Sequence, residues 1–339
     1  MMNKKKVLLA IALVVLLTGV FTLYKFFGPS VSQPDSKYLF IPTGTDYTSV
    51  KKILKEQHVL GGDTWFDWAS KMIGYNKVKP GRYEIAKGSS LVNLVRMLRN
   101  GSQKPVDFVI TKLRTKESLA GRIGRAFECD SLEMLQFLNN PDSLREYGLD
   151  TNTAMAAAMP LTYTIRWNTG ASGIFGHFYQ AYKTFWTDAR KQKAAALGLD
   201  PKEVITLASI IDEETNAPAD KPNVASTYLN RIRIGMPLQA DPTVKFALKN
   251  FGLRRILKVH TETASPYNTY VNRGLPPGPI CTPNESTIDS VLNAPKTEYL
   301  YFVANNDLSK KTHIFTTNYA DHLKYAHLYQ QELDKRNIK

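Results

Sequence analysis

Hydrophobic and polar positions in the first hundred residues repeat a strand followed by a helix. The stretch "YLFIP" at 38–42 alternates as a strand does, and apolar residues at helical spacing follow it. The same unit recurs as "RYEI" at 82–85 and a helix over 91–98, which Ser and Gly residues bound. With a further helix around 65–73, these elements predict a small α+β module over 37–104.

Beyond this module the periodicity predicts mostly helices. The segment "YNTYVNRGLPPGPI" at 267–280 is too rich in glycine and proline for regular structure and indicates a shaped loop. The stretches "YLYFVANND" and "THIFTT" favour a hairpin. Within 156–167 an extended segment is expected after Pro160. Helices are expected over 117–127, 175–197, from Pro201 until shortly before Pro218, over 221–235, after Pro242, over 286–294 and over 319–333. The predicted fold class is therefore α+β, with a mixed α/β domain over 105–339.

The N-terminal segment indicates where the chain is held. Lys4, Lys5 and Lys6 precede the uncharged stretch "VLLAIALVVLLTGVFTLY", which is about 27 Å long as a helix and can cross a bilayer core. Lysines before the span predict a single-pass anchor with the N-terminus in the cytoplasm and the body outside. A cleaved signal peptide is the alternative, but no A-x-A-like site follows the span. The expected segments are a cytoplasmic tail at 1–6, a transmembrane anchor at 7–27 and a short flexible linker at 28–36.

The net charge and the cysteine content limit which kinds of partner and cofactor are expected. The net charge is +14, and about ten of these positive charges lie outside the anchor region. Outside a membrane such a surface favours anionic lipid or an acidic wall polymer. We expect no nucleic-acid partner, since no helix-turn-helix signature or basic-aromatic stripe is present. Cys129 and Cys281 lack metal-ligand spacing and are compatible with one disulfide or two buried thiols, and nothing in the sequence indicates a metal or organic cofactor.

Three acids stand at the end of an apolar run in "LASIIDEETNAP", residues 207–218. Residues three and four apart share a helix face, so the apolar stripe that includes Val204 reaches Glu214. Asp212 and Glu213 follow mixed faces. Periodicity therefore selects Glu214 as the acid on the core face.

Two effects are expected to raise the pKa of Glu214. Partial burial disfavours the carboxylate, and so does the negative end of the helix dipole. A neutral carboxylic acid in a cleft can protonate a glycosidic oxygen. The competing interpretation is structural: a Glu at this position often pairs with an arginine of the next helix, here Arg231 or Arg233. Periodicity alone favours the structural interpretation.

Several blocks of sequence resemble the YceG/MltG-like family of membrane-anchored endolytic murein (lytic) transglycosylases. They are "LASIIDEET", "VASTYLNRIRIGMPLQADPTV", "YNTYVNRGLPPGPI" and "YLYFVA" followed by "HIFTTN", and they cover roughly 203–325 in the family's order. The match is looser over 37–104, where the resemblance implies a LysM-like module. The essential acid of the family is the second Glu of an E-x-E-T stretch. This stretch is "DEET" here, so the resemblance also implies Glu214 as the catalytic residue.

The resemblance implies cleavage of the β-1,4 bond between N-acetylmuramic acid and N-acetylglucosamine within glycan strands. Glu214 would protonate the bridging oxygen, and the C6 hydroxyl of the muramic acid would then attack C1 and form a 1,6-anhydro end. Peptidoglycan glycan strands would be the substrate, and wall synthases (penicillin-binding proteins) are candidate partners. The implied location is the inner (cytoplasmic) membrane, with the catalytic domain periplasmic or extracytoplasmic, where the enzyme would terminate nascent strands.

The same blocks imply substrate-binding residues. Gln239 and Asp241 would bind sugar hydroxyls or orient Glu214, although Asp241 is equally compatible with a helix N-cap. Tyr267 and Tyr270 would stack on sugar faces, one of them being open to a core role. The remaining implied contacts are from Asn230, Asn268, His313 and Asn318, and a structural role is the alternative for the strand histidine His313.

Two segments depart from the family pattern. An acid-Gly pair is replaced by "TKLRT" at 111–115, and an E-G-x-x-x-P-D-T-Y segment is replaced by "AAAMPLTY" at 156–163. These changes leave the shape of the cleft open. Two other functions remain compatible with the sequence: a muramidase that hydrolyses the same bond, and a non-catalytic scaffold that binds peptidoglycan.

Overall fold

The computed structural model describes residues 4–336 and divides into two compact units, both of which contain helices and strands. Two short segments from beyond residue 105 group with the first unit, which the sequence pattern does not anticipate. Unit 1 comprises the chain up to Asp107, Ala126–Cys129 and Thr164–Gly170, and unit 2 comprises Phe108–Arg125, Asp130–Tyr163 and the chain from Ala171 onward.

Unit 1 begins with the apolar helix α1 (Lys4–Phe27). Within the described residues it alone is long and apolar enough to cross a membrane, and it fits a single-pass anchor. Most of its large apolar side chains are exposed. Phe26 is the exception, because it is buried in the core of the module that follows.

The module has the elements that the periodicity predicts. They are β1 (Tyr38–Ile41), α2 (Tyr47–Glu56), α3 (Thr64–Ile73), β2 (Gly81–Glu84) and α4 (Leu91–Asn100). The two strands are antiparallel, with Leu39 opposite Tyr83. The Ser90 side chain accepts from the Asn93 N–H and caps α4, and Gly101 ends that helix with a left-handed φ of 69°.

The segment at 28–36 is not the flexible tether that its composition predicts. The N–H of Val31 donates to the Ser89 carbonyl at 3.1 Å, and the N–H of Ser32 donates to the Val59 carbonyl at 3.0 Å. The Gln33 amide donates to the Ile85 carbonyl at 2.9 Å. Because Val31 is also buried in the module core, this segment is fixed along the module's surface.

Downstream of the module the chain is mostly helical, as expected. Three short elements between 106 and 145 are absent from the sequence prediction, and the single helix predicted over 175–197 is in fact two. Thr187 ends the first of these two helices, because its Oγ1 accepts from the Arg190 N–H and so caps the start of the second.

The elements downstream of the module are β3 (Val106–Val109), α5 (Lys116–Ala126), α6 (Ser131–Asn139), α7 (Pro141–Arg145), the 3-10 helix η1 (Ala154–Ala157), β4 (Thr162–Ile165), α8 (Ala171–Phe185), α9 (Asp188–Ala196), α10 (Pro201–Glu214), α11 (Lys221–Arg233), α12 (Asp241–Ala247), α13 (Lys258–Thr261), α14 (Glu285–Leu292), β5 (Tyr301–Ala304), β6 (His313–Thr316) and α15 (Tyr319–Lys335).

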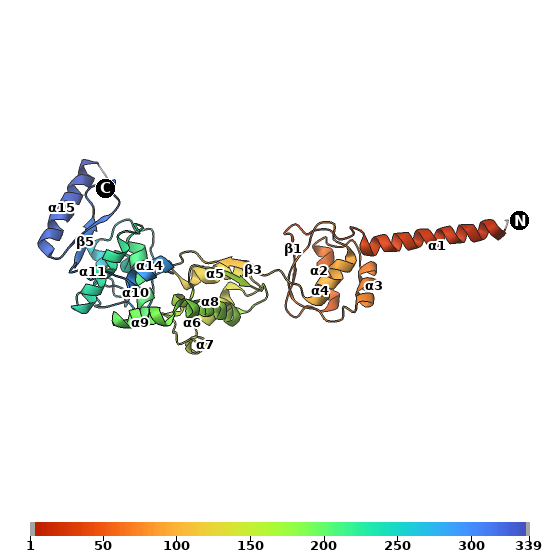
Figure 1. The fold of residues 1–339 in the computed structure, drawn as a ribbon, viewed down its shortest axis with the longest axis horizontal. Coiled ribbons are helices and arrows are strands. Elements are labelled where there is room, and N and C mark those ends of the chain that lie inside the picture. Colours follow the sequence, from red (N-terminus) through yellow and green to blue (C-terminus); the bar gives the residue numbers. More distant parts are fainter. Residues whose placement is uncertain (1–3, 337–339) are drawn as a thin grey trace. The chain divides into compact units, whose positions relative to one another are not determined.

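Helix α10 lies among α9, α11 and α14 in unit 2 (Figure 1). It begins with the predicted capping box, in which Asp200 and Glu203 each accept from the other's backbone N–H. α9, α11, α12, α14 and η1 all pack against it, so every residue from Val204 to Asp212 is buried. The predicted β5–β6 hairpin is also confirmed, with Tyr301 opposite Thr316, and α15 packs on it.

Candidate active site

The three acids that end α10 have three different environments. Asp212 is buried, whereas Glu213 and Glu214 are partly exposed. Periodicity is therefore wrong about Asp212, since a helix covered on all sides has no mixed face at that position. Glu214 lies in a cavity of about 280 Å³, which we name the Glu214 cleft; its lining is Glu214, Tyr228, Arg231, Leu238, Gln239, Asp241, Tyr270, Phe302 and His322.

Glu214 has a hydroxyl as its partner and not a cation. The Tyr228 hydroxyl donates to Glu214 Oε1 at 2.7 Å. Within the described residues Glu214 makes no ion pair, so the arginine pairing considered from the sequence is not formed. Burial raises the pKa of Glu214 to about 7; the Tyr228 hydrogen bond opposes this rise and the nearby Asp241 carboxylate adds to it. Near neutral pH the group can therefore both give and accept a proton.

Arg231 lines the same cleft, but its guanidinium donates to backbone carbonyls and not to Glu214. Its Nε donates to the Leu300 carbonyl at 2.7 Å, and its Nη1 donates to the Leu238 carbonyl at 2.6 Å. The guanidinium also stacks over the Tyr301 ring at 5.4 Å from its centre. These contacts join α11 to the loop before α12 and to β5, which places Arg231 at the cleft without neutralising Glu214.

A second carboxylate, Asp241, lines the cleft with Gln239. The Tyr270 hydroxyl donates to Asp241 Oδ1 at 2.6 Å. Asp241 is not the N-cap of α12, because Ala240 occupies that position and Asp241 is the first helical residue. Gln239 has an exposed side chain and a left-handed φ of 52°. Its N–H donates to the Thr269 carbonyl at 3.1 Å, which fixes this strained backbone next to the cleft.

Asp212 belongs to a polar group that we name the Asp212 cluster: Asp212, Lys221 and Thr287, which are buried, and Asn284, which is exposed. Lys221 Nζ donates to Asp212 Oδ1, as does the Thr287 hydroxyl at 2.7 Å, and the Asn284 amide donates to Oδ2 at 3.1 Å. Burial alone would raise the pKa of Asp212, but the hydrogen bonds from Lys221 and Thr287 outweigh it and leave the pKa below its usual value. This acid is therefore a charged structural group.

Glu213 is held by the segment "TKLRT" that departs from the family pattern. Arg114 donates to both carboxylate oxygens, at 3.1 and 2.8 Å, and Lys112 Nζ lies 3.1 Å from Oε1. Lys112 also donates to the Asp212 carbonyl at 2.6 Å and so caps the end of α10. In the second departing segment, Ala156 and Ala157 are buried in η1 against α10. Both departures thus support α10 from outside the Glu214 cleft.

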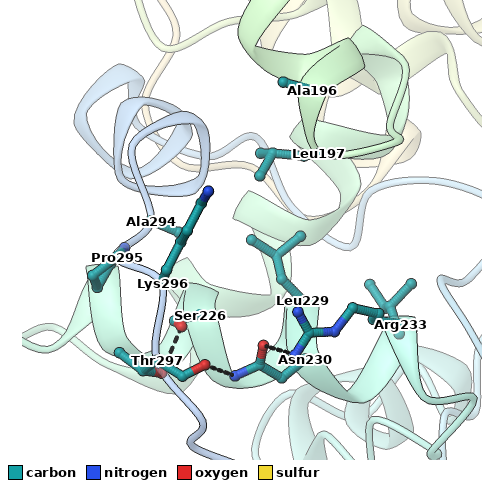
Figure 2. A pocket seen from close by; sticks show the side chains of 11 residues that line it. Ala196, Leu197, Ser226, Leu229, Asn230, Arg233, Ala294, Pro295, Lys296 and Thr297 are labelled. Atoms are coloured by element: carbon teal, nitrogen blue, oxygen red, sulfur yellow. Dashed lines mark hydrogen bonds between the residues drawn. The ribbon is translucent and has the colours of Figure 1, made fainter.

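Asn230 lies on the other face of α11, away from Glu214. Its amide donates to the carbonyls of Thr297 and Tyr299 at 2.8 and 3.0 Å, and its Oδ1 accepts from Arg233. This amide borders a separate hollow of about 440 Å³ between α9, α11 and the segment at 294–297. Figure 2 shows the Asn230 side chain beside Thr297 and Arg233 at this hollow. Its predicted sugar contact stays a prediction, and it would not be a contact within the Glu214 cleft.

The two loop residues Tyr267 and Asn268 also lie outside the Glu214 cleft. Tyr267 packs against Phe246, with ring centres 4.7 Å apart, and borders a different hollow. Asn268 is fully buried, and its amide donates to the carbonyls of Thr261 and Thr263 while its Oδ1 accepts from the Tyr270 N–H. Asn268 thus holds the loop that presents Tyr270 to the cleft. Of the loop residues predicted to bind sugar, only Tyr270 is beside Glu214.

His313 and Asn318 have local partners. The N–H and the Nδ1 of His313 each lie 2.8 Å from Asp220 Oδ2, and the ring meets the edge of Phe302 at 5.6 Å. Asn318 caps α15, where its Oδ1 accepts from the Asp321 N–H at 2.9 Å. His313 therefore stands behind the cleft wall formed by Phe302. A sugar contact at either residue stays a prediction.

Three residues that the sequence pattern does not predict also line the cleft: Tyr228, Phe302 and His322. Tyr228 and Phe302 both occupy positions that apolar periodicity assigns to the core. This pattern does not reveal that the Tyr228 hydroxyl is available to the cleft. His322 is on the first turns of α15, and its ring stacks on Tyr301 with centres 5.4 Å apart. Burial lowers the pKa of His322, and Arg231 lowers it further, so the ring is neutral at neutral pH. Its Nδ1 is buried and has no hydrogen-bond partner among the described residues.

Both cysteines are buried thiols and no disulfide joins them in the described structure. Within residues 4–336, no three His, Cys, Asp or Glu side chains come together in a way that could hold a metal ion.

Known proteins resemble this chain over most of its length. The model of the YceG-like family matches residues 39–327. An endolytic murein transglycosylase of Bacillus subtilis is 28% identical over 329 residues, which cover 89% of each chain. The endolytic murein transglycosylase of Streptococcus pneumoniae strain R6 is 25% identical, and the match covers 83% of this chain but only 56% of that longer protein. The crystal structure of a yceG-like protein from Listeria monocytogenes has a TM-score of 0.56 at 25% identity, and the match covers 85% of this chain and 97% of that one.

Proposed function

Because this chain belongs to the YceG-like family, we propose that it is a membrane-anchored endolytic murein transglycosylase with Glu214 as its acid and base. The observation that carries the proposal is the state of Glu214. It is a carboxyl group without a cationic partner, with a pKa raised to about 7, in a cavity with other polar side chains. Relatives that carry the name endolytic murein transglycosylase match most of this chain.

In the proposed reaction a single carboxyl group acts twice. Tyr228 holds Glu214 Oε1, so Oε2 carries the proton and gives it to the bridging oxygen. The bond from that oxygen to C1 of the muramic acid breaks, and the N-acetylglucosamine leaves with a C4 hydroxyl. The C6 hydroxyl oxygen then bonds to C1 and its proton returns to Glu214, which yields the 1,6-anhydro end. A pKa near the working pH suits both transfers.

Gln239, Asp241 and Tyr270 are the proposed substrate contacts within the Glu214 cleft. The Tyr270 ring offers a stacking face, and the carboxylate of Asp241 can accept from sugar hydroxyls. His322 adds a neutral imidazole to the same wall. The proposed roles of Asn230, Tyr267, Asn268, His313 and Asn318 would require the glycan to extend beyond this cleft, since none of the five lines it.

The anchor determines which strands the enzyme could reach. With Lys4, Lys5 and Lys6 on the cytoplasmic side, α1 would cross the inner membrane and the rest of the chain would be extracytoplasmic. We propose that residues 37–104 are a LysM-like module that contacts the wall. An enzyme so held would cut nascent strands near the membrane, beside wall synthases, and so terminate their elongation.

One observation favours a second candidate, a muramidase that hydrolyses the same bond. Hydrolysis of a glycoside uses two carboxyl groups, and Asp241 lines the same cavity as Glu214. Asp241 would then activate a water molecule. The two reactions differ in their product: hydrolysis leaves a reducing muramic acid, whereas transglycosylation leaves the anhydro form.

The test is mass spectrometry of uncrosslinked murein strands digested by the full chain in detergent micelles. Anhydro-ended internal fragments from wild type and from Glu213→Gln, but not from Glu214→Gln, would support the proposal. Glu213→Gln is the matched control, because it removes a neighbouring carboxylate that Arg114 and Lys112 hold outside the cleft. Reducing ends would favour the muramidase, and no cleavage by a folded wild type would favour a non-catalytic scaffold.

A further inference from the structure

Helix α3 of the module exposes two large apolar side chains on one face. Trp68 is 61% exposed and Met72 is 64% exposed. They are four residues apart and so lie one above the other on the helix. Lys71 and Thr64 are exposed beside them, whereas Phe66 and Ala69 face the module core. An exposed tryptophan and methionine on one face are typical of a surface that meets a partner.

This face of α3 is continuous with the membrane helix through aromatic contacts. The Trp65 ring packs against Phe21 and Phe26 of α1, with ring centres 6.0 and 5.7 Å apart. Trp65 also meets the edge of Trp68 at 5.9 Å. Figure 1 shows α3 beside the C-terminal end of α1, in agreement with these contacts. A chain of rings therefore leads from the membrane helix to the exposed face of α3.

The contact with Phe21 fixes the level of α3 along the membrane normal. Phe21 belongs to the uncharged span and lies four residues before Lys25, the first charge after it. At 1.5 Å per residue it is about 6 Å deeper than Lys25. A ring that touches Phe21 is therefore at the boundary between headgroups and acyl chains, where tryptophan side chains concentrate.

The module cannot lift away from this level without breaking its own core. Phe26 and Val31, on either side of the membrane exit, are both buried in that core. The Ser30 hydroxyl donates to the Lys25 carbonyl at 3.0 Å, which holds the turn after α1. The span and the module consequently share one rigid junction.

A hollow of about 510 Å³ lies at the same junction. Lys25 and Ser30 border it on one side, and the exposed Gly61–Gly62 loop and Trp65 border it on the other. A lysine next to polar backbone at this level can hold a lipid phosphate. Of the two acids at this part of α3, Asp67 is bound by Lys51 and Tyr47, whereas Asp63, the N-cap residue next to the Gly61–Gly62 loop, is exposed.

We propose that α3 is an interfacial docking helix, whose Trp68 and Met72 insert into the outer boundary of the bilayer that α1 crosses, with lipid phosphates beside Lys25. The module then lies on the membrane surface and is not suspended above it. This inference rests on α1 being a membrane span and is independent of the proposed reaction.

The test uses the full chain in lipid nanodiscs, labelled with an environment-sensitive fluorophore at Met72→Cys. Lys52→Cys is the matched control: it is on α2 of the same module, and its side chain is 76% exposed. Background labelling of the two native cysteines, which are buried, is measured by treating the wild type with the same fluorophore. We expect a blue-shifted emission at position 72 that brominated lipids quench, and neither effect at position 52.

A second variant tests the anchoring residue. Adding Trp68→Ser to Met72→Cys should reduce the quenching at position 72, because the helix loses the large exposed aromatic side chain of this face. Thermal unfolding checks that each labelled variant is folded. Emission and quenching at position 72 equal to those at position 52 would overturn the proposal, and quenching that does not change with Trp68→Ser would remove Trp68 from it.

Discussion

The Asp212 cluster and the Glu214 cleft begin two residues apart on α10 and use a carboxyl group in opposite ways. Asp212 is surrounded by Lys221, Thr287 and Asn284, which keep it charged. Glu214 is desolvated with only a hydroxyl as partner, which keeps it close to half protonated at neutral pH. The difference shows that desolvation alone does not set the pKa of an acid. Nearby cations and hydrogen-bond donors decide whether the acid stays charged and structural or can exchange a proton near neutral pH.

The largest effect is expected from a substitution that removes the proposed catalytic acid. Glu214→Gln keeps the shape of the side chain and the Tyr228 contact but has no proton to give. We expect cleavage of murein strands to fall by about 10²- to 10⁴-fold, with the Tm unchanged or higher. Rates of release of anhydro-ended fragments measure the first effect and calorimetry the second. A rate within a few-fold of wild type would place the acid elsewhere.

The corresponding change in the Asp212 cluster should act on the fold. Asp212→Asn leaves the Lys221 ammonium buried without its counter-charge, and breaking such a pair costs about 3–5 kcal/mol. The Tm of the full chain in micelles should therefore fall strongly.

Asp188→Asn is the control for this change. Its ion pair with Lys191 is exposed, and its loss should cost less than about 1 kcal/mol. Equal effects of the two substitutions would contradict the structural role of Asp212.

These two acids also mark how far sequence reasoning reaches. The capping box at Asp200, the stop after Glu214 and the stripe leading to Glu214 are local and follow from spacing. The burial of Asp212 does not, because it depends on how many helices surround α10. Its partners Lys221 and Thr287 come from other helices, and periodicity carries no information on such long-range pairs.

The site was predictable to a similar extent. Family motifs place Gln239, Asp241 and Tyr270 in one cleft with Glu214, although they come from two loops and a helix start. Asn268 shows why other motif residues are elsewhere. The buried amide of Asn268 is needed to satisfy the carbonyls of Thr261 and Thr263, in the segment just before the loop rich in glycine and proline. The contact between the Tyr228 hydroxyl and Glu214 could not be predicted from the sequence, because a tyrosine at an apolar position is often only a core residue.

A pH series sharpens the comparison, because the two acids act over different ranges. The pKa of Glu214 is about 7 in the folded chain, whereas the unfolded chain releases this proton near the ordinary glutamate pKa of 4.5. The folded state binds more protons in between, so stability falls as the pH rises from about 4.5 to about 7. Given the partial exposure of Glu214, we expect a loss on the order of 1 to 3 kcal/mol.

Asp212 has the opposite sign. Its pKa is lowered on folding, so its contribution is present above the unfolded value of 3.8 and is lost as the pH falls through the folded value. The Tm difference between wild type and Glu214→Gln should therefore change between pH 4.5 and 7, and that between wild type and Asp212→Asn should change only in more acid solution. A difference that is constant across both ranges would contradict both assignments.

The smallest expected effect comes from the one hydrogen bond that connects Glu214 to α11. The Tyr228 hydroxyl stabilises the Glu214 carboxylate, and its contribution lowers the pKa. In Tyr228→Phe the carboxylate loses that donor, so the alkaline limb of kcat/KM should move to higher pH while the activity at neutral pH falls by about tenfold or less. Tyr267→Phe removes a hydroxyl outside the cleft and should leave the limb in place even if it changes substrate binding. A limb that moves to lower pH in Tyr228→Phe would mean that Tyr228 favours the protonated acid, and the pKa of Glu214 would then need a different cause.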